Sequence, residues 1–239
     1  MTATLSRRVV AEGLGTAFLL AVVIGSGIMG ERLSGGNVAI ALLANTLATG
    51  AGLVALILTF GPISGAHFNP VVSMSDASQG GLSWRDVPWY VLAQSAGAFI
   101  GVATAHVMFD APIFSASEHV RSGPGQLVSE FVATFGLLAT IWGCVRSRPS
   151  VVPFAVGAYI AAAYWFTSST SFANPAVTLA RAASNTFAGI RPADAPWFIG
   201  AQLVGAAAGT ATFAWLVPRR APALPAHGRP DPEPSEEAA

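Results

Sequence analysis

The chain alternates between long apolar stretches and short polar connections. Six of the apolar stretches reach the roughly 20 residues that a helix needs to cross the hydrocarbon core of a bilayer. They cover residues 9–29, 37–60, 88–109, 126–146, 151–168 and 197–217. The pattern therefore predicts an all-α membrane protein with six transmembrane helices.

The composition agrees with this pattern. The 239 residues are 53% hydrophobic and 10% charged, whereas a soluble domain carries about 25% charged residues. The basic residues are all arginine, and 12 of them balance 12 acids. A net charge of zero gives no reason to expect nucleic acid as a partner. The single cysteine, Cys144, excludes an internal disulfide.

The pattern ends at residue 217. The remaining segment, 218–239, is rich in proline and acids and has no apolar periodicity, which predicts a disordered cytoplasmic tail. We expect residues 1–217 to form one channel-like domain built of two repeats, about 8–109 and 126–217.

Similar segments in the two halves indicate these repeats. PWYVLAQSAGAFIG at 88–101 and PWFIGAQLVGAAAG at 196–209 share seven of fourteen positions. AEGLGTAFLLAVVIG at 11–25 and SEFVATFGLLATIWG at 129–143 share Glu, Thr, Leu-Leu-Ala and Gly in register. Each half holds three spans, and because three is odd the second half must enter from the opposite face. Such an inverted repeat is typical of transport proteins with a site at the midplane.

Each repeat also contains one Asn-Pro pair, at Asn69-Pro70 and Asn174-Pro175. Asparagine is a favoured N-cap and proline is favoured at the first helical position, so each pair starts a helix. About ten residues follow before Gly80 and about twelve before Gly189, which is half of a membrane span. An ordinary loop turn is the alternative for one such pair, but two pairs at matching repeat positions favour helix starts.

By the inverted symmetry, the two half-helices enter from opposite faces and meet start to start near the centre. Non-helical backbone at that depth survives only where it lines a wet cavity or is buried in protein, which fits the links 61–67 and 168–173. Two positive helix ends at the pore centre repel cations and protons.

Arginine placement predicts the orientation. With both termini in the cytoplasm, the positive-inside rule is met by eight arginines against four. The inside set is Arg7, Arg8, Arg85, Arg146, Arg148, Arg219, Arg220 and Arg229, and the outside set is Arg32, Arg121, Arg181 and Arg191.

Over about residues 8–217 the chain resembles the aquaporin or major intrinsic protein family. The features that carry the resemblance are SGAHFNPVVS, FANPAV, the six spans and the glutamates Glu12 and Glu130. The resemblance implies the aquaporin fold and a homotetramer in which each subunit has its own pore. It also implies a passive channel without cofactor or metal, in a bacterial inner (plasma) membrane. The two motifs correspond to Asn69, Pro70 and Val71, and to Asn174, Pro175 and Ala176.

The chain departs from the family where the pore should be narrowest. The residue after the second motif is Val177, where the family usually has arginine. Carried over by spacing, the other constriction positions are Thr49, Ala162 and Ser171. This ring is small and uncharged, and it resembles that of glycerol-facilitator-like channels that pass undissociated arsenous acid.

Four polar residues have alternative readings. Glu12 and Glu130 are charges inside spans and could form an ion relay, but the resemblance favours bracing of the two half-helix links. His67 either lines the pore or makes a structural hydrogen bond within 61–68. Arg181, one turn beyond Val177, either returns a positive charge to the outer mouth or reaches headgroups; we favour the mouth.

The remaining histidines, His106, His119 and His227, have no metal-ligand spacing, so we assign no metal. The matching glycines Gly97, Gly101, Gly205 and Gly209 are expected to pack helices together.

The expected function is a passive channel for small neutral solutes: glycerol-like polyols, water and trivalent metalloid hydroxides such as arsenite. A water-selective aquaporin and an ion-coupled secondary transporter are the alternatives. An intramembrane enzyme ranks last, because no nucleophile and base are paired on facing helices.

Overall fold

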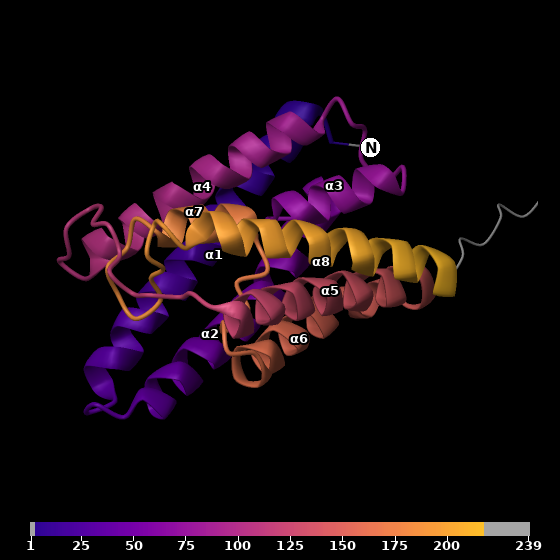
Figure 1. The fold of residues 1–239 in the computed structure, drawn as a ribbon. Coiled ribbons are helices and arrows are strands. Elements are labelled where there is room, and N and C mark those ends of the chain that lie inside the picture. Colours follow the sequence, from indigo (N-terminus) through magenta and orange to yellow (C-terminus); the bar gives the residue numbers. More distant parts are fainter. Residues whose placement is uncertain (1–2, 218–239) are drawn as a thin grey trace, which may run out of the picture.

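The computed structural model describes residues 3–217 of the chain as a bundle of helices (Figure 1). The predicted tail, 218–239, lies outside the described residues. In chain order the elements are α1 (Leu5–Leu33), α2 (Val38–Ser64), α3 (Pro70–Ser78), α4 (Val87–Met108), α5 (Pro124–Ser147), the 3-10 turn η1 (Pro149–Val151), α6 (Val152–Phe166), α7 (Pro175–Arg181) and α8 (Ala195–Leu216).

Six helices are long and apolar enough to cross a membrane, namely α1, α2, α4, α5, α6 with its leading turn, and α8. Each overlaps one predicted span, and no strand occurs within residues 3–217. The predicted fold class is therefore confirmed. One boundary differs: α2 continues through Pro62 to Ser64, so the first half of the link expected at 61–67 is helical.

The two repeats are built on equivalent helix pairs. In the first repeat α1 packs on α4, and in the second α5 packs on α8, with glycines at each crossing. A Cβ on Gly97 would lie 2.2 Å from the carbonyl oxygen of Gly13, and one on Gly205 would lie 2.5 Å from that of Phe131. Because only glycine allows the backbones to approach so closely, the predicted packing role of these glycines is confirmed.

The half-helices α3 and α7 have nine and seven residues. The length of α3 agrees with the sequence, but α7 is shorter than the twelve residues we predicted. It stops early because the chain beyond it pairs with another segment. The carbonyls of Ala182 and Ala183 accept hydrogen bonds from the backbone N–H groups of Ser117 and Ser115, so they are not used to continue the helix.

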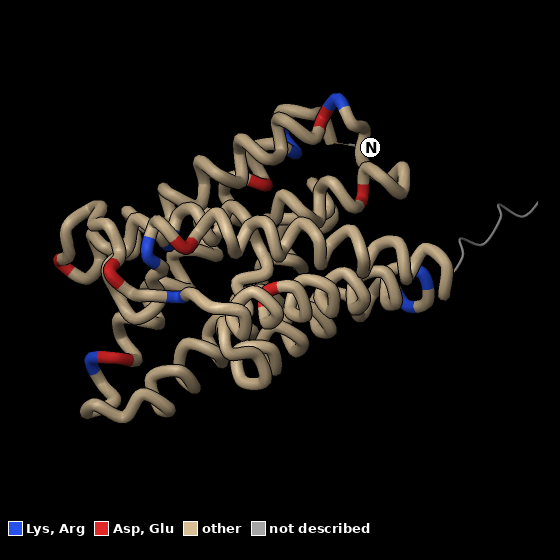
Figure 2. The backbone as a smooth tube through the Cα atoms, in the orientation of Figure 1, with Lys and Arg blue, Asp and Glu red and all other residues tan. Residues whose placement is uncertain are grey.

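Charged residues lie mostly at the two ends of the bundle and in its connections, and few lie along its length (Figure 2). The ends of the chain that the structure describes, at the start of α1 and the end of α8, lie on one side of the molecule (Figure 1). We call that side the terminal end, and the side of the connections 109–123 and 182–194 the opposite end.

Candidate functional site

The starts of the two half-helices meet inside the bundle. Asn69 and Asn174 stand immediately before α3 and α7 with extended backbones, and a proline follows each as the first helical residue. The Asn69 side-chain oxygen accepts from the N–H of Val71 at 3.1 Å. The Asn174 oxygen accepts from the N–H groups of Ala176 and Val177 at 3.0 and 3.3 Å. Each asparagine is therefore the N-cap of its half-helix.

The same asparagines tie the two repeats together. Asn69 Nδ2 donates to the carbonyl of Ala173 at 2.8 Å, and Asn174 Nδ2 donates to the carbonyl of Phe68 at 2.8 Å. A carboxamide nitrogen carries two hydrogens. Each asparagine thus uses one N–H in the cross-link, and its second N–H can donate to a molecule in the adjoining space.

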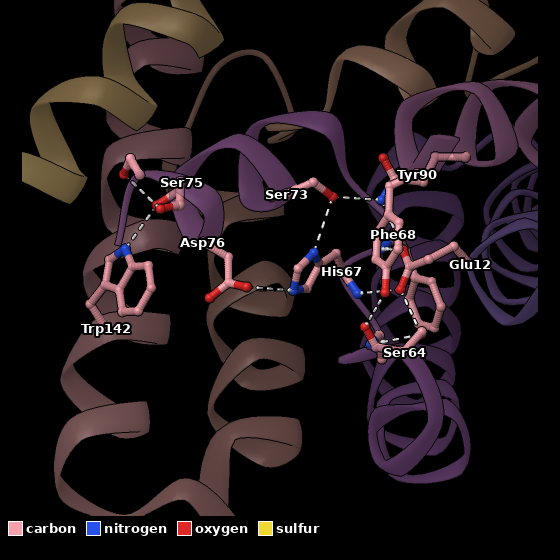
Figure 3. Close-up of polar contacts among 12 residues, drawn as sticks. Glu12, Ser64, His67, Phe68, Ser73, Ser75, Asp76, Tyr90 and Trp142 are labelled. Atoms are coloured by element: carbon pink, nitrogen blue, oxygen red, sulfur yellow. Dashed lines mark hydrogen bonds and ion pairs between the residues drawn. The ribbon is translucent and has the colours of Figure 1, made fainter. Parts of the chain in front are cut away.

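Glu12 braces the link before α3 from inside α1, where it is fully buried. One carboxylate oxygen accepts from the hydroxyl of Ser64 at 2.6 Å and the N–H of His67 at 2.9 Å. The other accepts from the N–H of Phe68 at 2.7 Å and from Gln94 Nε2 at 2.8 Å. Figure 3 shows the contacts of Glu12 with Ser64, His67 and Phe68.

Glu130 does the same for the link before α7. Its oxygens accept from the N–H groups of Phe172 and Ala173, both at 2.9 Å, and from Gln202 Nε2 at 2.6 Å. It is also fully buried. Both glutamates are therefore occupied by hydrogen bonds to the links, as expected for a bracing role.

The braces hold backbone that is otherwise unfavourable. Ala66, Phe68, Ser171 and Ala173 all have φ between 49° and 51°, a left-handed region in which residues other than glycine are uncommon. Such residues persist only where the surroundings fix them, and the glutamate hydrogen bonds to 67, 68, 172 and 173 supply that constraint.

Gln94 and Gln202 are members of the site that our sequence reasoning missed. Each is fully buried and joins its glutamate to a half-helix hydroxyl: Gln94 Nε2 to Ser73 at 2.9 Å, and Gln202 Nε2 to Thr178 at 2.8 Å. The signal was present, because both glutamines occupy the same position of the repeated PW…AQ segment.

A cavity of about 170 Å³ runs past the meeting point of the half-helices. One water needs only about 10–15 Å³ of such space. Apolar side chains of α1, α2, α5 and α6 form most of the wall. Among the polar lining residues are Thr49, His67, Asn69, Asp76, Asn174 and Arg181.

Three of the four predicted constriction residues, Thr49, Ser171 and Val177, line this cavity and are buried. The fourth, Ala162, does not. It is exposed on the outside of α6, and the cavity is lined instead by Ile160 and Tyr164.

Helical periodicity explains the error at Ala162. The buried positions of α6 are Pro153, Val156, Gly157, Ile160, Ala163 and Tyr164, which is one face of a helix with 3.6 residues per turn. Ala162 falls outside that face. The hydroxyl of Tyr164 donates to Thr49 Oγ1 at 3.3 Å, so tyrosine, rather than alanine, stands opposite Thr49.

Arg181 lines the cavity and is 2% exposed, which excludes the headgroup contact. Its Nε donates to the carbonyl of Ala188, and its guanidinium carbon lies 3.3 Å from the centre of the Phe172 ring. Helical side chains lean toward the helix start, so this residue projects along the same face as Val177. Its buried position at the cavity agrees with the interpretation that Arg181 returns a positive charge to the outer mouth of the pore.

His67 lines the cavity, as one of its two interpretations expected, but its side chain contacts α3 and not a partner within 61–68 (Figure 3). Its Nδ1 lies 3.1 Å from Ser73 Oγ, and its Nε2 lies 3.6 Å from Asp76 Oδ2. Ser73 Oγ already accepts from Gln94, so we assign its proton to the Nδ1 contact and the histidine proton to Nε2.

The opposite end carries a polar network that the sequence did not reveal. Arg121 is buried and donates to the carbonyls of Gly189 at 2.8 Å and Ser169 at 3.2 Å. Burial lowers the pKa of Arg121 to about 10, so it stays charged at neutral pH. His106 lies 2.7 Å from the carbonyl of Pro112 and 2.8 Å from Ser184 Oγ. These contacts fix the connections around the second link.

No group of three or more metal-ligating side chains occurs in the part of the chain that the structure describes.

The helix pairs, the two half-helices and the cavity at their junction define a membrane channel of the aquaporin fold. Residues 1–171 match the major intrinsic protein family. An aquaglyceroporin, AqpS, of Rhizobium meliloti (strain 1021) is 56% identical over 89% of this chain and 91% of its own length. Aquaporin NIP2-3 of Zea mays is 31% identical over 95% of this chain and 74% of its own length.

A solved structure has the same architecture. The aquaglyceroporin of Plasmodium falciparum aligns with a TM-score of 0.64, at 23% identity, over 89% of this chain and 95% of that chain. The chain belongs to the major intrinsic protein family and is an integral membrane protein.

Proposed function

We propose that this protein is a passive channel for small neutral solutes of about the size of glycerol, including polyols, water and trivalent metalloid hydroxides such as arsenous acid. The observation that carries the proposal is the cavity past Asn69 and Asn174, whose ring has Val177 where the family usually has arginine. The aquaglyceroporin AqpS, at 56% identity, supports the same class of solute.

Chemistry at the ring favours this class. The proposed constriction is formed by Thr49, Tyr164, Ser171 and Val177, with Arg181 beside it. It presents three hydroxyls and an apolar wall, so a hydroxylated solute can exchange part of its hydration for protein contacts. An unpaired hydroxyl costs on the order of 1–3 kcal/mol in a protein setting, and a charged oxyanion far more.

An ion-coupled transporter is disfavoured by the state of the buried carboxylates. Glu12 receives four hydrogen bonds and Glu130 receives three. Carboxylates engaged in this way stabilise a link, whereas a relay needs a partner that can take up and pass on an ion. We propose no enzymatic activity.

We further propose a homotetramer in a bacterial inner membrane, with both termini cytoplasmic. The arginine bias supports the orientation, and membership of the family supports the assembly. Cross-linking of the protein in its native membrane would test the number of subunits, and protease access to the tail would test the orientation.

The central experiment measures the volume change of vesicles that contain the purified protein. Glycerol or arsenous acid is added outside, with and without a proton or sodium gradient. A passive channel gives solute entry that does not saturate at low concentration and does not respond to the gradient. Entry that requires the gradient would favour the transporter instead.

A further inference from the structure

The two half-helices carry opposite charges at equivalent positions. Asp76 is the seventh residue after Asn69, and Arg181 is the seventh after Asn174. Both side chains line the cavity. The inverted repeat therefore assigns a carboxylate to one half of the pore and a guanidinium to the other.

Each charge sits beside an aromatic ring, again at equivalent positions. His67 Nε2 lies 3.6 Å from Asp76 Oδ2, and the Phe172 ring centre lies 3.3 Å from the Arg181 guanidinium carbon. A further ring backs each of these, with centroid distances of 5.6 Å from His67 to Tyr90 and 5.3 Å from Phe172 to Phe198. The two charges therefore have aromatic neighbours at equivalent positions and opposite signs.

The charges lie in different halves of the pore. From their meeting point, α3 runs toward the terminal end, while α7 lies toward the opposite end (Figure 1). Asp76 and Arg181 lie near the far ends of these helices. A solute that crosses the whole pore must pass the carboxylate and the guanidinium in turn.

Neither charge is explained by helix stability alone. A helix C-terminus favours a cation, which suits Arg181 but disfavours Asp76, two residues before the end of α3. Arg181 is 2% exposed, and among the described residues its terminal guanidinium nitrogens have no hydrogen-bond partner. Asp76 has 28% of its side chain exposed, and its side chain makes only the long contact to His67 within residues 3–217. A residue that breaks a local rule in this way is typical of a functional site.

We propose that Asp76 and Arg181 act as a bipolar ion filter, in which Arg181 excludes cations from one half of the pore and Asp76 excludes anions from the other. The proposal rests on the passive-channel function and explains how a pore without an arginine at position 177 can stay closed to ions. A fixed charge acts strongly on an ion in a narrow, partly dehydrated passage and only weakly on a neutral solute.

The filter should be unequal. The starts of α3 and α7 add positive potential at the centre, so cations meet a second barrier there even without Arg181. Anions, like cations, pay for desolvation but meet no second electrostatic barrier, so the electrostatic exclusion of anions depends on Asp76 alone. Loss of Asp76 should therefore admit chloride to a greater extent than loss of Arg181 admits potassium.

The test measures ion permeability of the purified full-length protein in planar bilayers under a potassium chloride gradient. Reversal potentials give the ratio of chloride to potassium permeability, and glycerol flux of the same preparation in vesicles gives the amount of working channel. Asp76→Asn should raise chloride permeability about tenfold or more relative to glycerol flux. Arg181→Gln should raise potassium permeability by a smaller factor, and the two reversal potentials should shift in opposite directions.

Charge-retaining and distant variants serve as controls. Asp76→Glu and Arg181→Lys keep the charge but alter the local contacts, so they should keep ion exclusion. Glu31→Gln and Arg85→Gln remove exposed charges that do not line the cavity and should leave both ion permeabilities at the wild-type level. If Arg181→Gln does not insert, the pair Asp76→Asn and Asp76→Glu decides the question.

Two results would overturn the filter: ion permeability that stays at the wild-type level in both neutralised variants, or an equal rise in both ions, which indicates a loosened protein. Absence of glycerol flux in the wild type would instead refute the proposed channel function.

Discussion

The two links that precede the half-helices are alike in their supports and different in what they present to the pore. Both have a buried glutamate, a glutamine, a hydroxyl of the half-helix and three residues with positive φ, which are Gly65, Ala66 and Phe68 in one link and Thr170, Ser171 and Ala173 in the other. The first link and its half-helix present His67 and Asp76 to the cavity, and the second link and its half-helix present Phe172 and Arg181. The repeated parts therefore form the scaffold, and the parts that differ between the repeats are those that we propose set selectivity.

The two ends of the bundle also differ, because the opposite end adds a second support to the link before α7. At the opposite end, the connection 109–123 is fixed to the second link and to 182–194 through Arg121 and backbone hydrogen bonds such as Ser117 N–H to the carbonyl of Ala182. The second link is thus held from two sides, by Glu130 within the bundle and by Arg121 from the connection. Ser171 and Val177, which we propose as constriction residues, belong to this doubly held region.

The largest expected effect tests the part that the repeats share. Asn69→Leu or Asn174→Leu should abolish solute flux, and the two losses should be equal. Each removes an N-cap, which costs about 1 kcal/mol, and leaves a buried carbonyl of the other link without its partner, which costs about 1–3 kcal/mol. Vesicle glycerol flux, with membrane insertion checked by protease protection, measures the result. Retained flux in a correctly inserted double variant would refute the pore assignment.

The bracing glutamates should reveal a small inequality between the repeats. Glu12→Gln and Glu130→Gln each replace an acceptor oxygen by an NH2 group that faces N–H donors. We expect a loss of about 2–4 kcal/mol in unfolding free energy for each, and the greater loss for Glu12, which has four donors against three. Thermal unfolding in detergent gives the comparison. If both variants lose a negligible amount of unfolding free energy, the links keep their conformation without the glutamates.

A substitution at Val177, in the second repeat, should change the selectivity of the pore between glycerol and water. Val177→Arg places a second guanidinium beside Arg181 and narrows the ring, so we expect glycerol flux to fall several-fold more than water flux. Val177→Arg combined with Arg181→Gln moves the cation back by one turn and is the matched control for charge crowding. Osmotic and solute permeabilities of the same vesicles give the ratio. An unchanged ratio of glycerol to water would mean that Val177 lies outside the constriction.

The smallest expected effect is a pH dependence of stability that arises only at the opposite end. Burial, together with Arg121 and Arg181, lowers the pKa of His119. A histidine whose folded pKa is depressed binds protons more readily when unfolded, so its contribution to stability is lost as the pH falls below the unfolded pKa of about 6.5. His119→Gln should flatten the fall in melting temperature between pH 7 and 5. The same slope in both proteins would assign the dependence to other groups.

The sequence by itself determined the architecture. Apolar length specified six spans, the odd number of spans in each repeat specified inversion, and Asn-Pro specified two helix starts, because these features depend on local propensity and on the thickness of a bilayer. The packing glycines could also be predicted, since they occur twice in register, and the bracing by Glu12 and Glu130 was implied by the family resemblance.

Only the tertiary structure decided which side chains reach the pore. Ala162 was assigned by spacing, but the rotation of α6 about its axis brings Tyr164 and Ile160 to the cavity instead. The early end of α7 depends on backbone pairing with residues 115–117. The burial of Arg121 depends on its contacts with Gly189, Ser169 and the Phe172 ring, and the burial of Arg181 on the carbonyl of Ala188 and the same ring. Contacts between segments far apart in the chain set these features, and no local pattern encodes them.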